Sequence, residues 1–300
     1  MSRKTAMHVF ASLAVVQWAM AYIMTRIALM HFTVEAAAFF RYFVAAVSIF
    51  AVALIRKTRL PKLKDLPLFL AGGASGFAVY VYLLNTGSKS LEASVVSFII
   101  SASPIATALL ARVFLCEKIG LIGWVSVCCA FSGVGVITVF KGGLSFTSGA
   151  VWICGSMLLI SIYNILQRKL LQRYSPLEIT AYCVIAGAGL LSVFAPQSFP
   201  QIFNVTAQGV ISVVVLGVFS TSGGYLCWAY ALSKADKTNE VMNYMFVTPI
   251  VTTLLGFLMI NETPHYSVFI GGALVLAGVF LINRRKPKAT VPNPAQDKGE

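Results

Sequence analysis

Apolar runs of about 20 residues recur along almost the whole 300-residue chain, and this feature limits its fold more than any other. A helix rises about 1.5 Å per residue, so each run is long enough to cross the hydrocarbon core of a bilayer. The composition agrees, because 11% of the residues are charged, whereas roughly a quarter are charged in soluble proteins. The polar stretches between the runs are too short to bury a core of their own. The sequence therefore predicts an all-α integral membrane protein without a soluble catalytic domain.

Ten transmembrane helices are expected from these runs. They are predicted over residues 6–29, 34–55, 67–86, 93–114, 119–140, 147–167, 176–195, 208–231, 239–260 and 265–283. Ten is an even number, so both chain ends lie on the same side. When that side is the cytoplasm, 19 of the 23 lysines and arginines lie in cytoplasmic segments, the exceptions being Arg26, Arg41, Lys89 and Lys141. The positive-inside rule favours this orientation, so we expect a multi-pass protein of the cytoplasmic (inner) membrane with both termini in the cytoplasm.

The net charge of +13 does not indicate a nucleic-acid-binding protein, because the basic residues alternate between short loops instead of gathering on one surface. The expected partners are the lipid bilayer and a small-molecule substrate, and not nucleic acid. His8, His31 and His265 lie far apart in the sequence, so we expect no metal site. We expect no cofactor either. The chain has no Gly-x4-Gly-Lys-Ser/Thr phosphate-binding motif, which argues against direct ATP hydrolysis.

The chain contains an internal repeat. A shift of 145 residues aligns 72–137 with 217–282 without a gap and gives 15 identities in 66 positions, among them Tyr80 with Tyr225, Pro104 with Pro249 and Glu117 with Glu262. Each half holds five spans, an odd number, so the second half is inverted relative to the first. Glu117 is then cytoplasmic and Glu262 external. We expect a first repeat over 1–143, a second over 144–285 and a polar cytoplasmic tail over 286–300, an organisation typical of secondary transporters.

Several motifs together resemble the ten-helix EamA-like family of the drug/metabolite transporter superfamily. Each half ends in Pro-x12-Glu and a glycine-bearing last helix, Arg41 lies in Phe-Phe-Arg-Tyr-Phe, and residues 224–232 read Gly-Tyr-Leu-Cys-Trp-Ala-Tyr-Ala-Leu. The resemblance covers about residues 6–283. It implies a pseudo-symmetric ten-helix fold around a central cavity and the movement of small metabolites, often outward. The first span departs from the family pattern, because residues 17–22 read Gln-Trp-Ala-Met-Ala-Tyr in place of the frequent Trp-Gly-Ser-Asn type.

The leading functional hypothesis is a secondary transporter that moves amino acids or similar small metabolites outward by alternating access. The alternative is a carrier or exchanger for anionic metabolites such as nucleotide sugars or nucleosides, which predicts extra basic residues in the cavity. An enzyme would need a cluster of carboxylates, histidines or an activated nucleophile near the midplane, and the sequence offers none. Proton antiport, passive uniport and exchange all remain open.

Aromatic and polar side chains near the middle of the spans are the candidates for lining the cavity. They are Trp18, Tyr22, Tyr80, Ser101, Tyr163, Asn164, Tyr225, Trp228 and Asn243. Their ring faces and hydrogen-bonding groups suit an aromatic or aliphatic metabolite better than a sugar phosphate. The alternative is that they serve as an interfacial aromatic belt or as ordinary helix packing.

Two charged residues are candidates for an intramembrane role. Arg41 lies about seven residues inside the second span, where a charge must face protein or a wet cavity. It is either an anchor for a carboxylate or phosphate, or a structural arginine that snorkels outward to carbonyl groups at a helix end. Glu240, at the start of the ninth span, is either a proton relay or an interfacial residue paired with Lys237.

Pro104 and Pro249 occupy equivalent places near the middle of their spans, where proline bends a helix, so we expect bends or hinges there. Glu117 and Glu262 are expected in tight turns, where they cap helix starts. The last helix of each repeat, which carries close-packed glycines, is a possible homodimer face.

Overall fold

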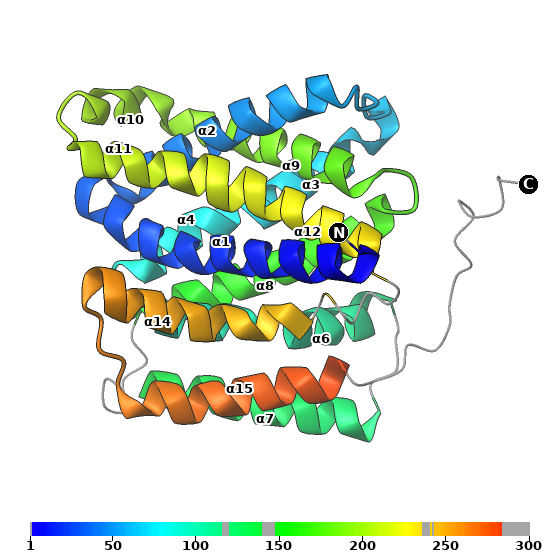
Figure 1. The fold of residues 1–300 in the computed structure, drawn as a ribbon, viewed down its shortest axis with the longest axis vertical. Helices are drawn as coiled ribbons and strands as arrows, with labels where there is room; N and C mark the ends of the chain where they lie inside the picture. The colour runs from blue at the N-terminus through cyan, green and yellow to red at the C-terminus, as the bar shows by residue number, and fades with distance from the viewer. Residues whose placement is uncertain (1, 116–119, 140–147, 236–240, 242, 284–300) are drawn as a thin grey trace, which may run out of the picture.

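The computed structural model describes residues 2–115, 120–139, 148–235, 241 and 243–283, and all regular structure in these residues is helical. Seven helices in this part of the chain are long and apolar enough to cross a membrane, and three shorter apolar helices lie at residues 121–137, 244–260 and 266–281. The ten helices coincide with the ten predicted spans. Figure 1 shows them packed as one bundle, in which α1 begins and α15 ends at the same end.

The first five spans are built from the following elements: α1 (Arg3–His31), α2 (Val34–Ile55), η1 (Leu63–Asp65), α3 (Leu66–Gly73), η2 (Ala74–Ala78), α4 (Val79–Ser88), α5 (Ala93–Ser101), α6 (Ser103–Leu115) and α7 (Leu121–Val139). The last five spans are built from these: α8 (Ser148–Leu170), α9 (Pro176–Leu191), η3 (Ser192–Phe194), α10 (Ala195–Ile202), α11 (Ala207–Val214), η4 (Val215–Gly223), α12 (Gly224–Lys234), η5 (Asn243–Val247), α14 (Thr248–Ile260) and α15 (Tyr266–Asn283).

Side-chain caps explain where several of these helices begin. Ser2 and Thr33 accept hydrogen bonds from the backbone amides of the third residues of α1 and α2, and Thr206 does the same for α11. Ser175 and Glu178 form a reciprocal capping box at the start of α9. These caps satisfy amides that an α-helix leaves without a partner in its first turn.

Two spans are interrupted by π-helical segments at related positions. η2 interrupts the third span and η4 interrupts the eighth, and the 145-residue shift places 74–78 on 219–223. The fourth span breaks at Ala102, two residues before Pro104, and its counterpart changes from 3-10 to α-helix at Val247, two residues before Pro249. The interruptions therefore follow the internal repeat. A hinge role for the two prolines stays a prediction.

The last helices of the two halves, α7 and α15, lie side by side at one edge of the bundle (Figure 1). Gly133 leaves no room for a Cβ against the Gly271 carbonyl, and Gly278 leaves none against the Ser126 carbonyl. The shift maps Gly133 on Gly278 and Ser126 on Gly271, so the two contacts are related by the repeat. Their order along the chain makes α7 and α15 antiparallel, as inverted repeats require. A homodimer through these helices stays a prediction.

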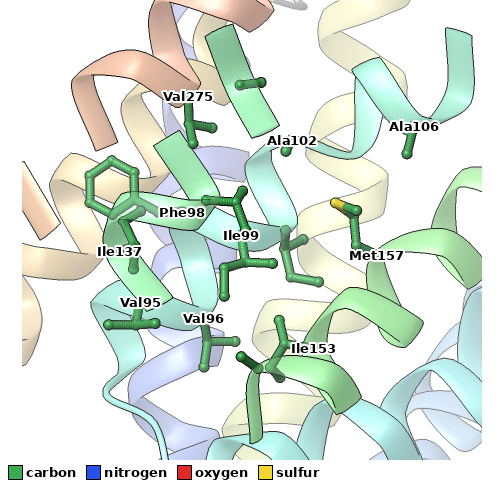
Figure 2. Close-up of a cluster of buried hydrophobic side chains, with 14 of the residues drawn as sticks. Val95, Val96, Phe98, Ile99, Ala102, Ala106, Ile137, Ile153, Met157 and Val275 are labelled. Carbon is green, nitrogen blue, oxygen red and sulfur yellow. The ribbon is translucent and has the colours of Figure 1, made fainter. Parts of the chain in front are cut away.

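The buried core is divided into clusters that surround a central region. Figure 2 shows one cluster, which contains Ile99 of α5, Ile153 of α8 and side chains of α7 and α15. Tyr80 packs against this cluster and against a second one formed by α2, α3, η2, α8 and α9. Tyr22 packs against the first cluster and against a third, formed mainly by α1, α2 and η4. Both tyrosines therefore lie between core clusters, at the centre of the bundle.

Candidate functional site

A continuous row of aromatic rings crosses the centre of the bundle. Trp18 of α1 contacts Trp228 and Tyr225 of α12, with ring centroids 5.0 and 5.7 Å apart. Tyr225 then contacts Phe77 of η2 at 5.7 Å, and Phe77 contacts Tyr163 of α8 at 5.1 Å. The structure thus brings together four of the predicted aromatic residues, and Phe77, which sequence reasoning missed, joins them. An apolar phenylalanine in an apolar span carries no signal that separates it from the core.

The π-helical segments position the two tyrosines related by the repeat. Tyr80 follows η2 by two residues, and Tyr225 follows η4 by two residues. A π turn widens the helix locally and is frequent at functional sites. Glycines let the neighbouring rings approach, since a Cβ added to Gly76 would lie 2.6 Å from the Tyr163 ring and one added to Gly224 would lie 2.7 Å from Trp18 Nε1. The small residues of these segments therefore bring the aromatic rings to the centre.

Three tyrosine hydroxyl groups at this centre remain available. Tyr22, Tyr80 and Tyr225 are only partly buried although each lies eight or nine residues inside the end of its span, and in the described residues their hydroxyl groups have no hydrogen-bond partner. All three lie near the Arg41 guanidinium. This accessible surface inside the spans is what a ligand at the centre of the bundle would contact.

Arg41 is buried, with 8% of its surface exposed, and it lies against η4. Its Nε donates a hydrogen bond to Thr221 Oγ1 at 3.3 Å, and its guanidinium carbon lies 5.5 Å from the centroid of the Tyr42 ring. Its Nη1 is buried and has no hydrogen-bond partner among the described residues. Gln17, one residue before Trp18, is also buried, and its Oε1 has no partner there either. Sequence reasoning missed Gln17 and Thr221, although an amide beside Trp18 in an apolar span was a usable signal.

The remaining predicted residues have local partners or lie outside what is described. Ser101 donates to the Phe98 carbonyl at 2.7 Å, and Asn164 donates to Thr107 Oγ1 at 3.3 Å. Tyr163 is almost fully buried, and its hydroxyl accepts a hydrogen bond from Gln167. The side chain of Asn243 and the whole of Glu240 lie outside the described part of the chain. So do the predicted boundary at residues 143 and 144 and the tail over 286–300.

A polar network joins the two halves at the predicted outer end. Glu262 lies in the turn after α14 and pairs with Arg26 of α1, with Nε and Oε1 3.1 Å apart. Its other oxygen accepts a hydrogen bond from the Ala93 amide at the start of α5, and Arg26 also donates to the Ser88 carbonyl at 2.8 Å. Glu262 thus caps a helix of the opposite half rather than the helix that follows it. Arg26 was not singled out from the sequence as a site residue, although it is the only lysine, arginine or acidic residue of α1 after the first two positions.

A cavity of about 220 Å³ lies away from this centre, between α6, α7 and α8, and its lining of apolar side chains includes Cys154 and Met157. None of the predicted site residues lines it. The described residues contain no group of three or more His, Cys, Asp or Glu side chains that is placed to hold a metal ion. The chemistry available at the centre is therefore that of aromatic faces, hydroxyl groups and one guanidinium.

The comparisons with known proteins agree with this architecture. The EamA-like transporter family matches residues 5–139 and 147–284 of the chain. The chain belongs to the EamA-like transporter family. A protein of Streptantibioticus cattleyicolor named as a probable terminal-alkyne amino-acid exporter is 31% identical to this EamA-like protein over 91% of this chain and 92% of its own. An uncharacterized transporter of Archaeoglobus fulgidus is 30% identical over 92% of this chain and 98% of its own.

A solved crystal structure with 17% sequence identity aligns with a TM-score of 0.65 and covers 93% of this chain and 98% of the other. That likeness concerns the fold alone. Together with the apolar helices, the family and its relatives make this EamA-like protein a multi-pass membrane transporter and not an enzyme.

Proposed function

We propose that this transporter exports amino acids or similar small metabolites across the cytoplasmic membrane without ATP hydrolysis. The observation that carries the proposal is the aromatic centre, where Trp18 contacts Tyr225, and where Tyr80 and Tyr225 lie near the buried Arg41. Aromatic faces contact an apolar side chain and attract an ammonium group, which are two of the groups of an amino acid. The relative named as a probable amino-acid exporter supports the same class of substrate.

Alternating access supplies the transport cycle in this proposal. The network of Arg26, Glu262 and Ala93 closes the predicted outer end by joining α1 and α5 to the turn after α14. Four interruptions are places where a span can bend while few backbone hydrogen bonds are broken. They lie at η2, η4, Ala102 and Val247. Their relation through the repeat supports equal and opposite bending of the two halves.

A carrier for anionic metabolites is the second candidate, and Arg41 is the observation that favours it. A nucleotide sugar brings two phosphate charges, so it calls for more than one cation. Among the described residues, Arg26 is engaged by Glu262 and Arg41 is the only basic side chain beside the aromatic row. We therefore rank this candidate below the amino-acid exporter.

Counterflow in proteoliposomes tests the proposal. Vesicles are preloaded in parallel with aromatic amino acids, aliphatic amino acids, purines or nucleotide sugars, and uptake of the labelled compound is measured. We expect exchange of amino acids that Trp18→Ala reduces, while Trp152→Ala, on an exposed part of α8, leaves it unchanged. Exchange confined to nucleotide sugars would overturn the proposal and promote the second candidate.

The proposed orientation has its own test. Single cysteines replace Arg112 and Thr263 in a variant without the native cysteines, and both positions are exposed. An impermeant thiol reagent added to intact cells should label position 263 and leave position 112 unlabelled. Labelling of both positions from one side would contradict the inverted arrangement.

A further inference from the structure

Arg41 is brought to the centre by the close approach of α2 and η4. A Cβ added to Gly217 would lie 2.8 Å from the Arg41 carbonyl oxygen and 2.7 Å from Val44, so glycine is what allows this approach. The guanidinium then reaches Thr221 and stays nine-tenths buried. Its position is set by tertiary packing and not by a helix end.

The hydrogen-bonding groups of Arg41 are mostly unused. A guanidinium carries five N–H donors, and only Nε donates to a described residue. The five acidic residues in the described part of the chain lie at helix ends, as Glu35, Asp65, Glu92, Glu178 and Glu262. A buried charged donor without a partner is costly. The terminal nitrogens of Arg41 are therefore available to a ligand group, because the described residues offer them no acceptor.

The surroundings of Arg41 select the class of that group. Tyr22, Tyr80 and Tyr225 lie near the guanidinium, and their hydroxyl groups have no hydrogen-bond partner among the described residues. Each hydroxyl is a donor for an anionic oxygen. One guanidinium balances the single charge of a carboxylate, whereas a phosphate monoester carries a charge of about −1.5 to −2 at neutral pH. One planar guanidinium surrounded by neutral hydroxyl groups therefore fits a ligand with a single carboxylate.

We propose that Arg41 binds the carboxylate of the transported compound through its two terminal nitrogens, and that Thr221 is the positioning residue that holds the guanidinium through Nε. The proposal rests on the proposed function and narrows it, because it makes a free carboxylate a requirement for binding. An amide or an ester of the same compound keeps the ring and the size but loses the charge.

Ligand binding to the purified protein tests the requirement without depending on transport. The probes are 3-phenylpropionate and 3-phenylpropionamide, followed by tryptophan fluorescence and by the shift in unfolding temperature. We expect the carboxylate to bind the parent protein at least tenfold more tightly than the amide. Arg41→Gln should lower carboxylate affinity by about 10- to 100-fold, as for loss of charged hydrogen bonds, and leave amide affinity within about twofold. Without ligand, Arg41→Gln should not lower the unfolding temperature, because it removes a buried charge whose Nη1 has no hydrogen-bond partner among the described residues.

Thr221 and its neighbour Ser222 provide the matched comparison. Thr221→Ala should lower the preference for carboxylate over amide several-fold, and Thr221→Ser, which keeps the hydroxyl, should restore it. Ser222 bonds to Ser48 and to the Ala45 carbonyl and not to Arg41, so Ser222→Ala should leave the preference unchanged.

Three results would overturn the proposal. They are equal binding of acid and amide by the parent protein, an unchanged preference in Arg41→Gln, and a fall in the unfolding temperature of ligand-free Arg41→Gln. Counterflow distinguishes failure of one proposal from failure of the other. If amino acids exchange but Arg41→Gln keeps the preference for acid over amide, Arg41 does not bind the carboxylate and the exporter proposal stands. If binding of the acid depends on Arg41 but amino acids do not exchange, the exporter proposal fails and the role of Arg41 stands.

Discussion

The two π-helical segments are related by the internal repeat, yet they meet different neighbours. η4 packs against α2, where Thr221 binds Arg41. η2 packs against α9, the counterpart of α2, where a Cβ added to Gly73 would lie 2.7 Å from the Ala186 methyl group. Gly76, which the shift places on Thr221, is covered by the Tyr163 ring instead. One half thus contributes a cation to the centre, and at the matching place the other contributes apolar and aromatic surface.

This difference separates two tasks of a transporter built from repeats. In the proposed alternating-access cycle, matching interruptions in both halves serve a movement that must work equally in two directions. A substrate has no such symmetry, so the groups that bind it need not be repeated. The backbone of the two segments follows the repeat, and the side chains around Arg41 depart from it.

The largest expected effect comes from filling the glycines that hold the segments against their neighbours. Gly73→Ala places a methyl group 2.7 Å from Ala186, 2.8 Å from the Gly187 amide and 2.9 Å from the Cys183 carbonyl. Gly217→Ala meets one carbonyl and the side chain of Val44, which has more freedom to move. Overpacking costs about 1–3 kcal/mol. We expect both variants to lower the unfolding temperature in detergent, and Gly73→Ala to lower it more.

Gly189→Ala is the control for this pair, because no heavy atom lies within 4 Å of the added Cβ. It should leave stability unchanged or raise it by up to about 1 kcal/mol through helix propensity. A larger loss in Gly217→Ala than in Gly73→Ala would show that the contact around Arg41 is the more rigid of the two.

A smaller effect is expected from the polar network that joins the halves at the predicted outer end. Glu262→Gln removes the charge opposite Arg26, and the two side chains are 10% and 25% exposed. Loss of about 1 kcal/mol of closure free energy raises the open population about fivefold. A cysteine in place of Tyr22 should then react about fivefold faster with an impermeant thiol reagent from outside.

The ion pair between Arg173 and Asp65, 2.8 Å apart, gives the matched control at the other end of the bundle. Arg173→Gln should leave the outside reaction rate of the cysteine at position 22 unchanged. Equal acceleration in both variants would indicate general loosening of the fold and would argue against a closure formed by Glu262.

The sequence predicts the spans and the relation between Tyr80 and Tyr225, because apolar runs and a gapless shift are properties of the chain itself. It does not reveal η2 and η4, since a π turn is defined by backbone hydrogen bonds and has no residue pattern of its own. Nor does it pair Arg41 with Thr221, 180 residues apart, or Arg26 with Glu262, 236 residues apart. These contacts arise from packing between the halves. The sequence identifies the charged residues, but it does not identify the partners that they bind.

The smallest expected effect is the difference in affinity between the Phe variants of the two tyrosines that the repeat relates. Tyr225 follows Thr221 by four residues and so lies on the same helix face, whereas the residue four before Tyr80 is Gly76. Both hydroxyl groups lack a hydrogen bond to described residues, so Tyr80→Phe and Tyr225→Phe should leave the unfolding temperature unchanged. Loss of one hydrogen bond to a ligand costs about 0.5–1.5 kcal/mol, or roughly 2- to 12-fold in affinity.

We expect Tyr225→Phe to raise the KM for counterflow more than Tyr80→Phe does, because the anchor lies on the side of η4. Tyr230→Phe, an exposed residue of α12 that packs on Phe10, should change neither KM nor stability. Equal effects at Tyr80 and Tyr225 would place the ligand on the symmetry axis between the halves. A larger effect at Tyr80 would place it on the side of η2, and the contrast between the two segments would then no longer explain which compound is carried.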